Sequence, residues 1–179
     1  MSGKLRIGII GCGDFLRLRA ADLLSSRQVE VKLLYSPVNS ANAERYAEIF
    51  GAKAADSPEA IINDPEIDVV CVFVPPFVRK EYVLAAAKAG KQIVATKPLA
   101  ADLSDAREMT EAVEQAGVRC GVIYRRTNNP VIEAYKEIFS GGEFGKLALY
   151  KQDWLHHYPT WNRWATDPKK MVAHSWTLC

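Results

Sequence analysis

One lysine and one glycine-rich turn are the residues of this 179-residue sequence whose types and places could support chemistry. Lys97 stands in Ala95-Thr-Lys-Pro-Leu99, directly after an apolar segment that we expect to be a buried strand. A lysine amine in such a place can donate a proton to a ligand or accept one. From its position alone, a solvated loop lysine is the simpler interpretation of Lys97.

The glycine-rich turn reads Gly8-Ile-Ile-Gly-Cys-Gly-Asp-Phe-Leu16 and lies between a predicted strand and a predicted helix. This is the setting that a dinucleotide-binding turn requires. Gly11 would allow the tight turn, and Gly13 would let the backbone approach a pyrophosphate. The start of the helix offers free N–H groups and the positive end of the helix dipole.

Two residues of this turn depart from the usual fingerprint. Leu16 occupies the place of the third glycine, which normally allows close packing of helix on strand, so we expect the helix to be pushed outward or re-aimed. Asp14 places a carboxylate at the helix start, where it would compete with a phosphate. A plain glycine turn in a flavodoxin-like domain that binds nothing is therefore the alternative.

The end of the second predicted strand bears on the choice of dinucleotide. An acidic residue is expected there to bind a ribose 2′-hydroxyl, but the sequence reads Tyr35-Ser-Pro-Val-Asn39. With Ser36 in place of a carboxylate, a 2′-phosphate is not repelled, and Arg45 is the nearest arginine downstream. This favours NADP over NAD, although Ser36 also fits a simple turn residue before Pro37.

Strands that alternate with helices must position these residues. Short apolar segments predict strands over 5–10, 29–35, 52–55, 69–74, 92–95 and 118–124. Helical spacing predicts helices over 15–26, 40–50, 77–89, 102–116 and 130–139, with a short helix opening at Ser57. This alternation indicates an α/β fold, a doubly wound parallel sheet of the Rossmann type. Ligands in such sheets bind outside the carboxyl ends of the strands.

Composition excludes several classes of protein. The chain is 49% apolar and 25% charged, with 23 Lys+Arg against 21 Asp+Glu and a net charge of +2. These values argue against a disordered chain, a collagen-like or coiled-coil protein, and a protein that mainly coats nucleic acid or membrane.

Neither a signal peptide nor an apolar stretch of about 20 residues is evident, so we expect a cytoplasmic location. The four cysteines form no CxxC pair, His156 and His157 lack further ligands, and no metal site is expected.

Three segments together resemble the glucose–fructose oxidoreductase/inositol dehydrogenase/MocA (Gfo/Idh/MocA) family. They are residues 7–13, residues 68–100 with their AGK…KPLA spacing, and residues 121–146 with Asn129-Pro130 and Gly142-Glu-Phe-Gly-Lys146. The resemblance implies an NAD(P)-dependent oxidoreductase that acts on a sugar, inositol or related polyol. It also implies a Rossmann domain over residues 1–125, followed by a second, α+β domain.

The family's Glu-Lys-Pro motif maps onto Thr96-Lys97-Pro98. The resemblance implies that Lys97 is catalytic, contacting the nicotinamide ribose and the substrate hydroxyl and assisting proton transfer during hydride transfer. The cofactor-binding residues expected from the turn, the strand ends and the resemblance together are Gly11, Gly13, Asp14, Phe15, Leu16, Ser36, Val74, Pro75, Lys97 and Pro98.

Two positions depart from the family pattern near Lys97. Thr96 replaces the glutamate of Glu-Lys-Pro, and Arg79 stands where the family commonly has the histidine of an Asn-x-x-His stretch. These departures suggest a divergent cofactor site. They keep open the alternative of a non-catalytic nucleotide-binding or interaction protein.

The last stretch differs in composition, since all tryptophans and histidines follow Lys151. We expect residues 126–179 to be a connecting helix and a stub of the second domain, because the family's Asp-x-x-x-His motif is absent and the chain reads as truncated. Alternation over 147–155 predicts the first strand of that domain. A strand without partner strands suggests either a homo-oligomer through residues 147–179 or a stub that folds back over the Rossmann domain.

Overall fold

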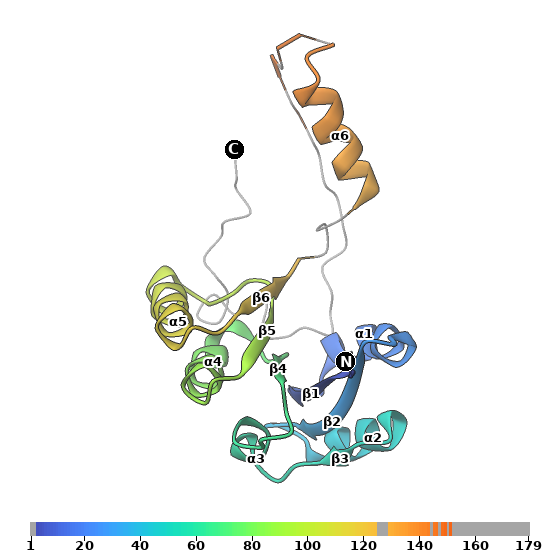
Figure 1. The fold of residues 1–179 in the computed structure, drawn as a ribbon, viewed down its shortest axis with the longest axis vertical. Helices are drawn as coiled ribbons and strands as arrows, with labels where there is room; N and C mark the ends of the chain where they lie inside the picture. The colour runs from blue at the N-terminus through green and yellow to red at the C-terminus, as the bar shows by residue number, and fades with distance from the viewer. Residues whose placement is uncertain (1–2, 125–128, 144, 147, 150, 152–179) are drawn as a thin grey trace.

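The computed structural model describes residues 3–124, 129–143, 145–146, 148–149 and 151 of the chain. The predicted alternation of strands and helices is present in this part (Figure 1). The strands are β1 (Leu5–Ile10), β2 (Val29–Tyr35), β3 (Lys53–Ala54), β4 (Val69–Val72), β5 (Gln92–Thr96) and β6 (Cys120–Ile123). The helices are α1 (Asp14–Ser25), α2 (Ser40–Phe50), α3 (Pro58–Ile62), α4 (Arg79–Lys88), α5 (Leu103–Ala116) and α6 (Pro130–Ser140), with a 3₁₀ turn, η1 (Pro76–Val78).

All six strands form one parallel sheet in the order β3-β2-β1-β4-β5-β6. The chain first moves outward from β1 to β3 and then returns to build β4, β5 and β6 on the other side of β1. The two halves therefore diverge between β1 and β4. In open α/β sheets a ligand crevice forms at this kind of switch point, outside the carboxyl ends of the strands.

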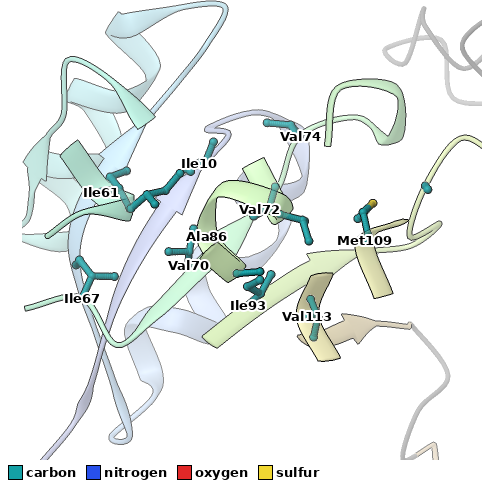
Figure 2. Close-up of a cluster of buried hydrophobic side chains, with 14 residues drawn as sticks. Ile10, Ile61, Ile67, Val70, Val72, Val74, Ala86, Ile93, Met109 and Val113 are labelled. Carbon is teal, nitrogen blue, oxygen red and sulfur yellow. The ribbon is translucent and has the colours of Figure 1, made fainter. Parts of the chain in front are cut away.

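Helices cover the two faces of the sheet through two apolar clusters. The first is built under α1 and α2, and its members include Ile9, Leu16, Leu34 and Tyr46. The second lies under α3, α4 and α5 and includes the ten residues labelled in Figure 2, among them Ile61, Val72 and Met109. Continuous burial of β4 explains its apolar run, since a parallel strand is covered on both faces. The predicted Rossmann-type α/β fold is confirmed.

Capping residues set several helix starts, and the short helix opens at Ser57 as the sequence predicts. Asn39 Oδ1 accepts a hydrogen bond from the Ala41 N–H, Ser57 Oγ from Ala60, and Asp102 Oδ1 from Asp105. Helix α2 ends at Gly51, which adopts the left-handed conformation that glycine favours. These caps fix where the helices enter and leave the edges of the sheet.

Some predicted boundaries were wrong. The apolar run predicts a strand to residue 74, but β4 ends at Val72. Phe73 and Val74 are buried although they follow the strand, so the apolar run is longer than the strand itself. Helical spacing also places Leu103 on the apolar stripe of α5, but this residue is exposed. Of the strand expected over 147–155, only three residues are described, at 148, 149 and 151, and none is in a strand. The remainder, with most of the proposed oligomer interface, lies outside the described residues.

Helix α6 carries an apolar side that no other described element covers. It buries none of its residues, and Val131, Tyr135, Ile138 and Phe139 are all largely exposed. Figure 1 shows the helix standing apart from the sheet, beyond β6.

Candidate dinucleotide site at the carboxyl ends of the strands

The turn after β1 is held by hydrogen bonds to the ends of β2 and β4, the two strands that flank β1 in the sheet. The Gly11 N–H donates to the Tyr35 carbonyl at the end of β2 (2.8 Å), and the Phe73 N–H donates to the Ile10 carbonyl (2.8 Å). Gly11 has a φ of +109°, and a Cβ added to it would lie 2.7 Å from the carbonyl carbon and oxygen of Phe73. Only a glycine fits there, so the turn brings the ends of β1, β2 and β4 together at the switch point.

Gly13 leads into α1 and leaves the start of that helix open. A Cβ added to Gly13 would find no atom within 4 Å, and no side chain among the described residues caps the helix. Its first N–H groups are therefore free for an anion, at the positive end of the helix dipole. Asp14 is exposed and pairs with Arg17 (Oδ1 to Nε, 3.4 Å), which offsets part of the negative charge expected to compete there.

Leu16, which replaces the third glycine of the fingerprint, is fully buried in the core cluster under α1. Its side chain therefore cannot reach a ligand, and only its backbone remains available. Phe15 is partly buried, and its ring lies edge-on to the Phe73 ring, with centroids 4.9 Å apart. This contact joins the start of α1 to the loop after β4.

Ser36 follows β2 and is partly buried. No acidic residue lies between Tyr35 and Asn39, so this strand end carries no carboxylate. Arg45 lies exposed on α2 with its guanidinium 5.8 Å from the centroid of the Tyr46 ring. A basic group therefore stands on the helix that follows Ser36.

The loops after β4 and β5 complete the edge. Val74 is buried in the core, and Pro75 is partly buried beside it. Lys97 follows the last residue of β5 and is exposed, with a cis peptide bond to the partly buried Pro98. Because β4 and β5 are adjacent in the sheet, both loops lie at the same edge as the glycine turn.

Arg79 was noticed in the sequence only as a departure from the family pattern, yet it joins these two loops. Its guanidinium donates to the carbonyl of Val74 after β4 and to the carbonyl of Thr96 at the end of β5, both at 2.6 Å. The side chain is 1% exposed. One signal in the sequence could have revealed it: an arginine in the first turn of a helix opposes the helix dipole, so its side chain must serve another contact.

The cysteines at this end of the sheet are structural. Burial raises the pKa of the Cys12 thiol and of the Cys71 thiol to about 12. Such thiols remain protonated at neutral pH and are poor nucleophiles. The described residues contain no group of three or more potential metal ligands of the His, Cys, Asp or Glu type.

An apolar depression of about 530 Å³ lies elsewhere on the sheet, lined in part by Leu5, Val69 and Gln92. These residues begin β1, β4 and β5 and so lie at the opposite edge from the glycine turn. The site predicted from the sequence is formed by the loops at the carboxyl ends of the strands. Among the helices of the described part, none combines the length and apolar character needed to cross a bilayer.

The strand order and the glycine turn define an α/β domain of the Rossmann class. Comparison with known families agrees: residues 5–124 match the Gfo/Idh/MocA model, described as an oxidoreductase family with an NAD-binding Rossmann fold. The chain belongs to the Gfo/Idh/MocA family.

Individual relatives support this assignment. The chain is 32% identical to an uncharacterized oxidoreductase of Streptococcus pneumoniae, over 95% of this chain and 46% of that protein. It is 29% identical to the scyllo-inositol 2-dehydrogenase (NAD(+)) of Bacillus subtilis, over 84% of this chain and 44% of the relative. A solved structure of a 3-ketoreductase from Actinomadura kijaniata with NADP matches with a TM-score of 0.72 and 26% identity, covering 80% of this chain and 46% of that one. The chain thus spans a little under half the length of these relatives.

Proposed function

We propose that this chain binds a nicotinamide dinucleotide across the carboxyl ends of β1, β2, β4 and β5, and takes part in the oxidation or reduction of a sugar, inositol or related polyol. The observation that carries the proposal is a series of contacts along this edge. Tyr35 bonds to Gly11, Gly11 packs on Phe73, and Arg79 links the β4 loop to Thr96. The family description and the names of the relatives support it.

The residues present fit a dinucleotide at this edge. The open backbone at Gly13 and the uncapped start of α1 would bind the pyrophosphate. Val74, Pro75 and Pro98 would border the nicotinamide half, which supplies or accepts the hydride when bound. Lys97, exposed on the same edge, would hold a substrate hydroxyl and move its proton.

We propose NADP as the preferred dinucleotide. The segment from Tyr35 to Asn39, which includes Ser36, carries no carboxylate to repel a 2′-phosphate, and Arg45 offers a positive charge on α2, the helix that follows it. The solved relative with NADP supports this preference, whereas the inositol dehydrogenase relative is named for NAD(+). Arg45→Ala should therefore weaken binding of NADPH and leave binding of NADH unchanged.

A second candidate function is non-catalytic binding of the dinucleotide. The observation that favours it is the contact between Thr96 and Arg79, the two positions that depart from the family pattern beside Lys97. The two candidate functions share the binding step and differ only in turnover.

We also propose that residues 1–125 form the nucleotide-binding unit and that residues 126–179 belong to a second domain which contributes to substrate selection.

The experiment that tests the proposal is a fluorescence titration of the chain with NADPH and NADH, followed by turnover with a panel of sugars and polyols. Lys97→Ala is the test variant for turnover. Lys88→Ala is its matched control, since Lys88 is also exposed but lies in the last turn of α4. Activity lost in the first variant and kept in the second supports the catalytic role.

Each outcome has a defined meaning. Tight binding of a dinucleotide with no turnover of any substrate would favour the non-catalytic candidate. Equal turnover by the Lys97→Ala and Lys88→Ala variants would overturn the role of Lys97. No binding of either dinucleotide would overturn the proposed function as a whole.

A further inference from the structure

Arg79 occupies an unusual environment for an arginine. Its side chain is 1% exposed, and no carboxylate of the described residues forms an ion pair with it. The guanidinium instead donates to four backbone carbonyls and one hydroxyl. They are Val74 O (2.6 Å), Thr96 O (2.6 Å), Leu99 O (3.0 Å), Pro98 O and Thr96 Oγ1 (2.6 Å).

These acceptors surround the peptide that carries Lys97. Thr96 lies before this lysine, and Pro98 and Leu99 lie after it, so one planar group holds both flanks of the residue. The fifth contact, to Val74, ties this segment to the end of β4. The Lys97 side chain itself remains exposed. The backbone under the lysine is therefore fixed while its amine stays free to meet a ligand.

The chemistry of the guanidinium explains why arginine serves here. Its fork presents several N–H donors in fixed directions, whereas a lysine ammonium has one compact head. Burial lowers the pKa of Arg79 to about 10, so the group remains charged at neutral pH. Burying this charge carries a desolvation cost, which the surrounding carbonyl dipoles and the Thr96 hydroxyl offset in part. The hydrogen bonds that Arg79 donates to described residues all reach the end of β5 and the loops after β4 and β5, which points to a role at this edge of the sheet.

We propose that Arg79, together with the Thr96 hydroxyl, is a positioning residue that holds Lys97 in place for the nicotinamide half of the dinucleotide. The inference rests on the proposed function for the identity of the ligand. It goes beyond that function in assigning a joint role to two residues that depart from the family pattern. The adenosine half of the ligand, bound at the glycine turn, is independent of this pair.

The test compares two ligands in matched variants. Arg79→Met removes all the donors, and Thr96→Val removes only the hydroxyl while keeping the shape of the side chain. Thr96→Ser, which keeps the hydroxyl, is the control. Each is titrated with NADPH and with 2′,5′-ADP, which is the adenosine fragment of NADP and lacks the nicotinamide half.

We expect NADPH to bind about tenfold more weakly to Arg79→Met, since roughly one charge-assisted contact to the ligand is lost when Lys97 moves. A smaller loss is expected for Thr96→Val and none for Thr96→Ser. The affinity for 2′,5′-ADP should stay at the wild-type value in all three. Equal losses for both ligands, or unchanged NADPH binding in Arg79→Met and Thr96→Val, would overturn the positioning role.

A second measurement needs no ligand and so separates this inference from the proposed function. Hydrogen exchange should accelerate in Arg79→Met at the amides of residues 97, 99 and 100, with β1 and β4 unchanged. Exchange that is the same as wild type over 97–100 would contradict the inference even if NADPH binds. If local exchange rises while no dinucleotide binds the wild type, the proposed function fails and the structural part of the inference stands.

Discussion

Gly11 and Gly13 lie two residues apart in the same turn, and the structure assigns them different roles. Gly11→Ala should destabilise the fold, whereas Gly13→Ala should not. At Gly11 an added Cβ would meet the Phe73 carbonyl carbon and oxygen at 2.7 Å and the Val74 nitrogen at 3.0 Å. All three are backbone atoms, so no side-chain rotation can relieve the contact. The φ of +109° adds strain for any residue with a Cβ.

The magnitude follows from these two effects. An unfavourable positive φ costs roughly 1–3 kcal/mol, and overpacking in a closed region costs a further 1–3 kcal/mol. We therefore expect Gly11→Ala to lose about 2–6 kcal/mol of unfolding free energy, a large part of the roughly 5–15 kcal/mol typical of a domain. At Gly13 the φ of −96° suits any residue, and no atom lies within 4 Å of an added Cβ. Alanine is a poorer helix cap than glycine, which lowers the unfolding free energy, but it loses less conformational entropy on folding, which raises it. These two effects nearly cancel, within about 1 kcal/mol.

Urea denaturation followed by circular dichroism measures both variants under one protocol. A lower midpoint with an unchanged slope is expected for Gly11→Ala, and a midpoint near that of wild type for Gly13→Ala. Gly13→Val, which adds bulk at the open start of α1, should also remain folded but lose NADPH binding. Equal midpoints for Gly11→Ala and Gly13→Ala would refute the reasoning, since they would mean that the β4 backbone does not constrain the turn.

Three further predictions concern stability. The hydrogen bonds from the Arg6 guanidinium and backbone N–H lower the pKa of Asp68 from 3.8 to about 2, so unfolding free energy should fall as pH drops from about 4 to 2. Asp68→Asn should flatten this part of a pH series of thermal melts; an unchanged series would contradict the assignment. Asn39→Ala should lose about 1 kcal/mol at the start of α2, measured by urea denaturation with Asn39→Ser as the control that keeps a cap. Met109→Ala should lose about 2–5 kcal/mol in the same assay, because Met109 is 1% exposed within the core under α5; a loss below 1 kcal/mol would mean that this core is loosely packed.

The sequence predicted the arrangement of the sheet because its signals were local. Apolar runs of strand length, the capping residues and the glycines at helix ends placed most strands and helices within a few residues of their observed bounds. The end of β4 was placed too late, because Phe73 and Val74 are apolar and buried although they follow the last residue of the strand. An apolar run in the sequence indicates which residues are buried, but it does not indicate which backbone groups form the hydrogen bonds of the sheet.

The candidate edge was predicted in part. Lys97 and the glycine turn stand beside strand ends, and the topology of parallel strands brings such ends together. The contacts of Arg79 could not be predicted in the same way, because its acceptors Thr96, Pro98 and Leu99 lie 17–20 residues away along the chain. Every residue has a backbone carbonyl, so the residue types do not reveal which carbonyls will accept a hydrogen bond. Only the folded chain relates the first turn of α4 to the segment after β5.

The position of β1 in the middle of the sheet has a consequence for the order of folding events. β1 pairs with β2 after a short excursion, but its other edge must wait for β4, and the Arg6–Asp68 contact beside that pairing joins residues 62 apart in the chain. Bringing together residues so far apart in the chain is slower than forming a helix or pairing strands that are close in the sequence. Helical signal should therefore recover early on refolding, and the gain of NADPH fluorescence should follow the slowest cooperative phase, since the switch point does not exist until β1 and β4 have met.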